Sequence, residues 1–145
     1  MRLAVMKKFE FLDISTADVA AAAYGRTLEE LYANAAMALM EIVTDTRKVK
    51  EAKERRFEVR GHDFKALMFN WLNEVLYVST SEGMLFSKFR VDIDERTLVL
   101  KAVCWGEKLD RKKHDMRGEV KAVTYHRMEI RKDGDYYRAQ VIFDV

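Results

Sequence analysis

The sequence predicts an α+β fold in which two amphipathic helices pack on a mostly antiparallel β-sheet. Three observations carry this prediction. Two segments repeat apolar residues with the period of a helix, other segments alternate apolar and polar residues as strands do, and short turns join consecutive strands. With 145 residues, 49% of them hydrophobic, and no proline, the chain is expected to fold as one domain over residues 1–145.

Both predicted helices begin at residues that cap helix N-termini. Thr27 opens a helix predicted over residues 27–44, and Glu30 stands three residues later as the partner of a capping box. Asp63 caps the second helix, which is expected to end near Gly83. Each helix carries apolar residues in the i, i+3, i+4, i+7 pattern, so each is expected to bury that face on the sheet.

The remaining apolar segments have the alternation and flanking turn residues of strands. Strands are predicted around Phe9 and Phe11 and over residues 19–24, 55–60, 86–93, 97–105, 120–130 and 136–145. The last two flank Asp133 and Gly134, which favour a tight hairpin turn. Residues 107–118 are polar and basic without a period, and they are predicted to form a surface loop in which His114 is solvated.

Composition excludes several classes of protein. The chain has 26 basic and 24 acidic residues, so its formal charge of +2 does not predict strong direct binding of nucleic acid. Its single cysteine, Cys104, excludes an internal disulfide framework and fits a cytoplasmic location. The apolar start over residues 1–5 is too short for a secretory signal, and no apolar run is long enough to span a membrane. Glycine-rich phosphate loops and common hydrolase motifs are absent, so an ordinary enzyme is not predicted.

An acidic turn between the first two predicted strands is one candidate site. Asp13 and Asp18 flank Ser15 and Thr16, which puts two carboxylates and two hydroxyls in one short segment. Such oxygen atoms bind hard cations like calcium or magnesium. The same residue types also close turns through their own side chains, so a purely structural role stays open.

The end of the sequence brings two more acidic groups together. Strand alternation separates Asp144 from the apolar row that ends at Phe143. The side-chain carboxylate of Asp144 and the terminal carboxylate of Val145 are therefore expected to lie close to each other. Two anions repel unless a cation or an arginine lies between them, and the alternative is that both face solvent with Arg138 screening them.

Residues 119–126, with the sequence EVKAVTYH, form the third candidate. Regular alternation divides the strand into one face with Val120, Ala122, Thr124 and His126 and another with Lys121, Val123, Tyr125 and Arg127. Basic side chains beside a tyrosine contact phosphates, nucleotides or acidic partners. The alternative is a solvated face with cross-strand ion pairs and a packed or hydrogen-bonded His126.

Taken together, these segments resemble the archease family over nearly the whole chain from Lys7 onward. The resemblance is carried by Phe9-Glu10-Phe11-Leu12-Asp13, Thr16-Ala17-Asp18-Val19, Tyr24-Gly25, Thr27-Leu28-Glu29-Glu30, Trp71-Leu72-Asn73-Glu74, the 119–126 block and Phe143-Asp144-Val145. It implies an accessory protein of tRNA splicing that is not itself an enzyme. Family members activate an RtcB-type RNA ligase by promoting its guanylylation and multiple turnover.

The resemblance also implies a divalent metal, usually calcium, near one end of the sheet. Matching motif positions assigns its ligands to Asp18, Asp144 and Val145, and makes Lys121 the contact to the ligase or its nucleotide. The family pattern Asp-His-Thr-Ala-Asp is one residue longer here and has Ser15 in place of histidine, so Asp13 does not align as a ligand.

Two other functional classes stay open. One is a chaperone-like binding module for an RNA-modifying enzyme such as a tRNA methyltransferase, which would need an exposed apolar patch. The other is a small metal-dependent hydrolase that uses the carboxylate cluster, which would need an open cleft and a positioned base.

Overall fold

The structure, a computed structural model, describes residues 7–145, so the apolar start over residues 1–5 lies outside the described part. In chain order the elements are β1 (Phe9–Ile14), β2 (Asp18–Gly25), α1 (Leu28–Val43), a 3-10 turn η1 (Thr46–Lys48), β3 (Lys53–Arg60), α2 (Phe64–Glu82), β4 (Met84–Asp94), β5 (Val99–Lys108), β6 (Ala122–Asp133) and β7 (Tyr136–Asp144). The predicted α+β class is confirmed, and each predicted helix and strand is present within a few residues.

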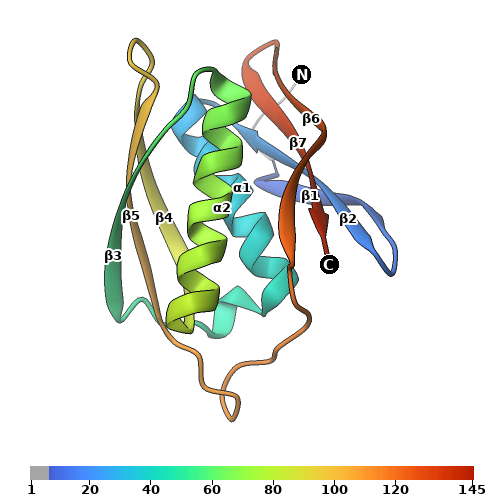
Figure 1. Cartoon of the computed structure of the whole chain (residues 1–145), viewed down its shortest axis with the longest axis vertical. Helices are drawn as coiled ribbons and strands as arrows, with labels where there is room; N and C mark the ends of the chain where they lie inside the picture. The colour runs from blue at the N-terminus through green and yellow to red at the C-terminus, as the bar shows by residue number, and fades with distance from the viewer. Residues whose placement is uncertain (1–6) are drawn as a thin grey trace.

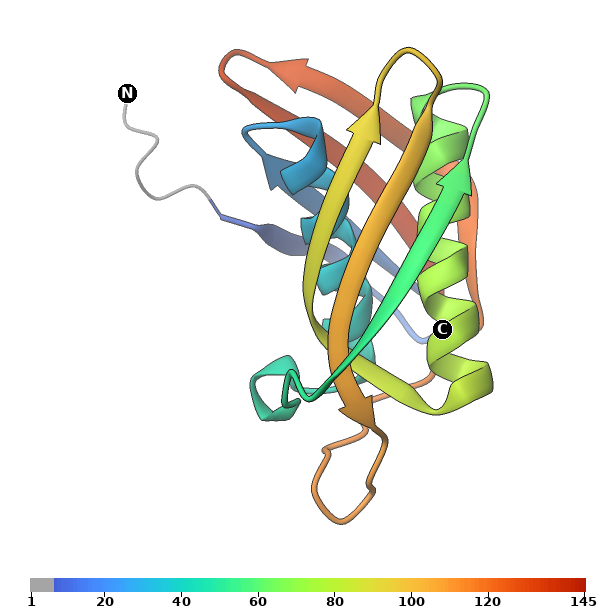
Figure 2. The same ribbon diagram turned by 90° about the vertical axis from the view of Figure 1, so that its left-hand side faces the viewer.

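The strands form two antiparallel sheets rather than one. One sheet has the strand order β1-β2-β7-β6 and the other β3-β5-β4. Figure 1 shows α1 and α2 between these two sheets, and the turned view of Figure 2 shows the three-stranded sheet in front of the helices. The helices are thus covered from both sides, which a single sheet would not do.

The sequence of α1 explains this three-layer arrangement. Leu31 and Met40 are nine residues apart, which is about 2.5 turns, so they point to opposite sides of the helix. Both are at most 1% exposed. Alanines fill the positions between them, including Ala36 and Ala38, and are buried as well. A helix with so wide an apolar surface needs a partner on each side.

The predicted caps form as expected. The Thr27 hydroxyl accepts a hydrogen bond from the Glu30 N–H at 3.1 Å, and the Glu30 carboxylate accepts one from the Arg26 N–H at 3.0 Å. The Asp63 carboxylate accepts a hydrogen bond from the Ala66 N–H at 2.7 Å. These bonds satisfy backbone donors that a helix leaves unpaired in its first turn.

Trp71 ties the helix layer to the three-stranded sheet. Its side chain is fully buried, and its indole N–H donates to the Tyr32 carbonyl at 2.9 Å, which links α2 to α1. Phe57 on β3 and Phe89 on β4 meet the indole edge-on, with ring centroids 6.0 and 6.1 Å away. One side chain therefore joins both helices to two strands.

The prediction of a solvated His114 is wrong. Residues 109–121 do form a loop between β5 and β6, but His114 is only 3% exposed. Its Nδ1 accepts from the Asp110 N–H at 2.9 Å, so its Nε2 carries the proton and donates to Glu107 at 2.9 Å. Polar neighbours close in sequence satisfy the imidazole, and the loop folds over it.

Glu107 is the centre of this loop network and gives a pH-dependent prediction. Hydrogen bonds from Lys113, the Lys50 backbone N–H and His114 hold the pKa of Glu107 at about 2, below its ordinary value of 4.5. A lowered carboxyl pKa stabilises the folded state fully above about pH 4.5, and this contribution is lost as the pH falls toward 2. We expect Glu107→Gln to be less stable than the unaltered chain at neutral pH.

The measurement is denaturant unfolding of both chains at several pH values. The stability difference between them should shrink steadily between about pH 4.5 and pH 2, because only the unaltered chain titrates at this position. Asp45, whose pKa is also lowered to about 2 by Arg47, titrates in both chains and cancels in the comparison. A difference that does not change with pH would show that the charge of Glu107 contributes nothing to stability.

Candidate functional site

The ends of β2 and β7 place two carboxylates side by side. Asp18 begins β2, Asp144 ends β7, and the antiparallel register pairs these residues directly. Side chains of directly opposed residues point to the same face, with Cβ atoms about 4.5–5.5 Å apart. Neither carboxylate forms an ion pair with any residue in the described range 7–145. Two like charges in this arrangement destabilise the strand ends unless a cation lies between them.

The turn before β2 is closed by Ser15. The Ser15 hydroxyl accepts hydrogen bonds from the N–H groups of Ala17 at 3.2 Å and Asp18 at 3.0 Å, and the Ser15 N–H donates to the Asp18 carbonyl at 2.8 Å. Ser15 thus has a structural role in the turn. Asp13 pairs with Ala20 on β2, next to a register shift in β1, and is not directly opposite Asp144.

The structure brings all four predicted site residues to this end of the sheet. The Val145 N–H donates to the Ala17 carbonyl at 2.9 Å, and the Lys121 N–H donates to the Asp144 carbonyl at 2.8 Å. Lys121 is exposed. In Figure 1 this end lies where the chain end marked C approaches the turn between β1 and β2. We call the group of Asp18, Lys121, Asp144 and Val145 the strand-end cluster.

The donor chemistry of the strand-end cluster fits a hard divalent cation. Asp18 and Asp144 supply carboxylate oxygens and Val145 supplies backbone oxygens, which calcium prefers over nitrogen or sulfur. Within residues 7–145, no group of three or more His, Cys, Asp or Glu side chains is placed to hold a metal ion. A cation at the strand ends would therefore complete its coordination with backbone and water oxygens. The roles of these residues remain predictions.

The predicted alternation through residues 120–127 is wrong. Val120 and Val123 were assigned to opposite faces, yet both are buried. Thr124 pairs with Ile142 and Glu129 pairs with Gln140, so residues 125–128 all lie opposite a single residue of β7. His126 is exposed and its side chain forms no hydrogen bond within residues 7–145, so the alternative of a packed or hydrogen-bonded His126 does not hold either.

This insertion is a bulge that sequence periodicity did not reveal. Its backbone turns at Arg127, which has a φ of 53° in the left-handed region. We call residues 125–128 the β6 bulge. The bulge exposes Tyr125, His126 and Arg127 in place of a regular strand.

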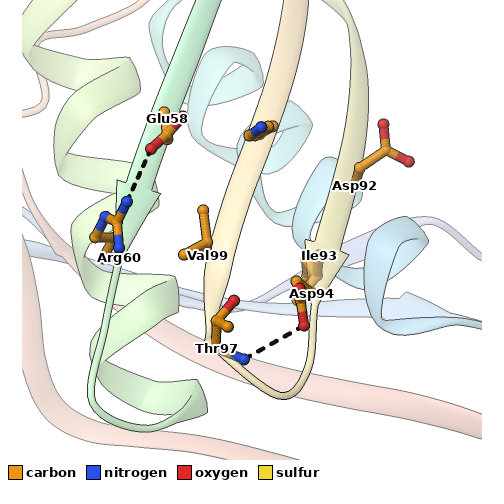
Figure 3. A pocket seen from close by; sticks show the side chains of 8 residues that line it. Glu58, Arg60, Asp92, Ile93, Asp94, Thr97 and Val99 are labelled. Carbon is orange, nitrogen blue, oxygen red and sulfur yellow. Dashed lines mark hydrogen bonds and ion pairs between the residues drawn. The ribbon is translucent and has the colours of Figure 1, made fainter.

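A hollow of about 530 Å³ lies on the outer face of the three-stranded sheet, away from the strand-end cluster (Figure 3). It is lined by Glu58, Arg60, Asp92, Ile93, Asp94, Thr97, Val99 and Lys101. Arg60 pairs with Glu58 at 3.3 Å, and the Thr97 N–H donates to Asp94 at 3.3 Å. The hollow is shallow, three acidic and two basic residues line it, and it contains none of the predicted site residues.

Cys104 does not supply a nucleophile. It is fully buried, and this burial raises the pKa of its thiol above the ordinary range. A protonated, buried thiol is unreactive.

The comparisons with known proteins identify the family. The sequence profile of the archease protein family matches residues 9–145. The chain belongs to the archease family. It is 46% identical over 140 residues to the archease of Sulfurisphaera tokodaii, which covers 97% of this chain and 100% of the relative. It is also 46% identical over 142 residues to the archease of Methanothermobacter thermautotrophicus, with the same coverage.

Solved structures agree with this assignment. The solution structure of Methanobacterium thermoautotrophicum protein 1598 matches with a TM-score of 0.85 and 45% identity, over 97% of this archease and 100% of that chain. A Thermotoga maritima crystal structure, described as an archease and possible chaperone, has a TM-score of 0.65 and 24% identity over 90% of this chain and 93% of that one. The second match shows a shared fold. No helix within residues 7–145 of this archease is long and apolar enough to cross a membrane.

Proposed function

We propose that this archease activates an RtcB-type RNA ligase in tRNA splicing by promoting its guanylylation and multiple turnover. Membership of the archease family supports the accessory role. The observation that carries the proposal is the strand-end cluster, because it joins two opposed carboxylates and the exposed Lys121 at one end of the sheet.

Each residue of the strand-end cluster has a distinct task in this proposal. Asp18, Asp144 and the backbone oxygens of Val145 hold a divalent cation, expected to be calcium, which neutralises the two carboxylates and fixes the ends of β2 and β7. The Lys121 ammonium then contacts an anionic group of the ligase or its nucleotide. The strand-end cluster docks on the ligase and binds the conformation that is ready for guanylylation more tightly than the resting conformation. Docking therefore favours the ready conformation.

Single-turnover guanylylation of an RtcB-type ligase tests the proposal. The rate is measured with and without this archease, with calcium present or chelated. We expect stimulation that falls when calcium is chelated or when Asp18 is changed to asparagine. Asp92→Asn is the matched control, because Asp92 is an exposed carboxylate on the outer face of the other sheet. No stimulation of a cognate ligase would contradict the activator role.

Lys121→Ala tests the contact role separately. We expect it to reduce stimulation of the ligase while leaving calcium binding in place, because Lys121 contacts Asp144 through its backbone N–H, which alanine keeps. The control is Lys101→Ala, which removes an exposed lysine from the opposite sheet. Unchanged stimulation by Lys121→Ala would remove this residue from the proposed interface.

A chaperone-like role for an RNA-modifying enzyme such as a tRNA methyltransferase is the second candidate. It is favoured by Leu12 and Ile14 of β1, which are 43% and 66% exposed. In this role the archease would keep the enzyme soluble through apolar contact. Light scattering of the heated enzyme, with the unaltered archease and with Ile14→Ser, tests it. Protection from aggregation without any effect on guanylylation would favour this candidate.

A further inference from the structure

The β6 bulge presents three consecutive side chains that the proposed function does not use. Tyr125, His126 and Arg127 are exposed, and Tyr125 is 46% exposed. Val123 before them and Met128 after them are buried, at 4% each. The exposed residues therefore project from a backbone that is anchored in the core on both sides.

The backbone of the bulge is held in a conformation that an arginine rarely adopts. Arg127 has a φ of 53°, and its carbonyl accepts a hydrogen bond from the Gln140 side chain at 3.1 Å. Within residues 7–145 the one other non-glycine residue with positive φ is Leu98, which lies in the tight turn between β4 and β5. Turn geometry explains Leu98, whereas a regular strand would need no such conformation at Arg127. Strain of this kind gathers at functional sites.

Tyr125 is fixed as a flat surface on the edge of the sheet. Its ring stacks on Phe69 of α2, with the centroids 4.6 Å apart and the planes at 29°. Phe69 sets the orientation of the tyrosine ring, and the residue as a whole is 46% exposed. An oriented, exposed aromatic ring is the platform on which proteins stack the bases of single strands.

Arg127 supplies positive charge, and both neighbouring residues supply hydrogen-bond donors. The side chains of His126 and Arg127 form no ion pair or hydrogen bond with other residues in the described part of the chain. A guanidinium in this state binds phosphate oxygens through two parallel hydrogen bonds. The bulge thus combines a base platform at Tyr125 with a phosphate-binding guanidinium two residues further along the chain.

We propose that the β6 bulge binds a nucleotide of a single-stranded nucleic acid, with its base stacked on Tyr125 and the adjoining phosphate held by Arg127 and His126. Two adjoining side chains reach only one or two phosphates, and the net charge of +2 adds no strong general attraction, so the expected affinity is modest. This site is independent of the strand-end cluster and of the proposed ligase activation.

A protein partner fits this surface less well. β6 is an edge strand, but the bulge interrupts its hydrogen-bonding edge and so prevents a partner strand from adding to the sheet. The three exposed residues include no aliphatic side chain, whereas the buried centre of a protein interface is rich in apolar groups.

Fluorescence anisotropy with the full chain tests the site. The probe is a labelled oligonucleotide of mixed sequence and about 12 nucleotides, offered at low salt as single-stranded RNA, single-stranded DNA and RNA duplex. Tyr125→Ala is expected to weaken single-strand binding by roughly five- to a hundredfold, because one stacked base is lost. Tyr125→Phe keeps the ring and should bind normally. Stronger binding of RNA than of DNA would assign the site to RNA, and equal binding would assign it to single strands in general.

Arg127→Gly separates a binding role from a structural one. Glycine adopts a positive φ without strain, so this variant should be at least as heat-stable as the unaltered chain. It lacks the guanidinium, so its affinity for single strands should fall. The slope of log affinity against log salt concentration should also become shallower by about 0.7, because one phosphate contact is lost. Tyr77→Ala is the control, since Tyr77 is a 67% exposed tyrosine on α2 outside the bulge, and this variant should bind normally.

Three results would overturn the proposal. The first is no single-strand binding by the unaltered chain at millimolar protein. The second is equal loss of affinity in Tyr77→Ala and Tyr125→Ala. The third is normal binding by Arg127→Gly. If the bulge variants instead weaken binding to the ligase while no oligonucleotide binds, the surface belongs to a protein partner.

Discussion

Trp71→Ala is expected to lower the free energy of unfolding by about 3–5 kcal/mol, the range for removing a large buried aromatic side chain. The indole is fully buried, and it contacts Phe57 and Phe89 on two strands of the three-stranded sheet. Its loss also removes the hydrogen bond from α2 to the Tyr32 carbonyl of α1. Because domains of this size are stable by only about 5–15 kcal/mol, this variant should be close to unfolding.

Trp105→Ala is the matched control for this experiment. Trp105 lies on the outer face of the same sheet, is only partly buried, and has the Lys88 ammonium 4.9 Å from its ring centre. Its replacement leaves no internal cavity, so its effect should be much smaller. Urea unfolding followed by circular dichroism gives both values. Similar losses in the two variants would show that Trp71 does not link the layers as proposed.

The helices and their ends could be predicted because local residues determine them. Thr27 and Asp63 cap the helices through their own side chains, and Gly83 ends α2 with a φ of 63° that favours glycine. The hairpin turn at Asp133 and Gly134 follows the same local rule. Such contacts lie within a few residues of one another, so the sequence carries them directly.

The division into two sheets depends on contacts that are distant in the sequence. β3, β4 and β5 separate from the other strands because α1 needs cover on both sides, as Leu31 and Met40 show. The sequence pattern identified the apolar face of each helix but not how far it extended around α1. The small side chains of Ala36 and Ala38 gave only a weak signal of burial.

Two polar features were missed for different physical reasons. A basic segment around His114 has the composition of a solvated loop, but Glu107 and the Asp110 N–H satisfy the imidazole inside the fold. At the β6 bulge, the sequence can be read as a regular alternation of period two. In the structure, β6 has extra residues between Thr124 and Glu129 that have no partners of their own on β7. Val123 before the bulge and Met128 after it are both buried, although a regular alternation would place them on opposite faces.

The strand-end cluster was predicted by resemblance more than by spacing. Asp18 and Asp144 are far apart in the sequence, and strand patterns do not reveal that β2 and β7 are neighbours. The register that pairs them comes from the sheet. Sequence alternation did identify Asp144 as a residue outside the apolar row, and the structure agrees, with Phe143 buried beside it.

Asp144→Asn is expected to change stability in opposite directions with and without calcium. In chelator, the variant should be more stable by roughly 0.2–1 kcal/mol, because it removes the repulsion between two directly opposed carboxylates. In calcium at about 100 times its dissociation constant, the unaltered chain should gain about 2.7 kcal/mol, and the variant should gain almost nothing. Thermal unfolding in chelator and in calcium measures both effects.

Opposite signs distinguish a metal ligand from a residue that merely supports the fold. A side chain needed for packing or hydrogen bonding would destabilise the protein under both conditions when replaced, whereas a ligand held beside another anion destabilises it only when the cation is present. Asp92→Asn, on the outer face of β4, should show no difference between the conditions. The proposed calcium site would be wrong if calcium does not stabilise the unaltered chain, or if it stabilises Asp144→Asn equally. In that case the two carboxylates share no ion, and only solvent screens the repulsion between them.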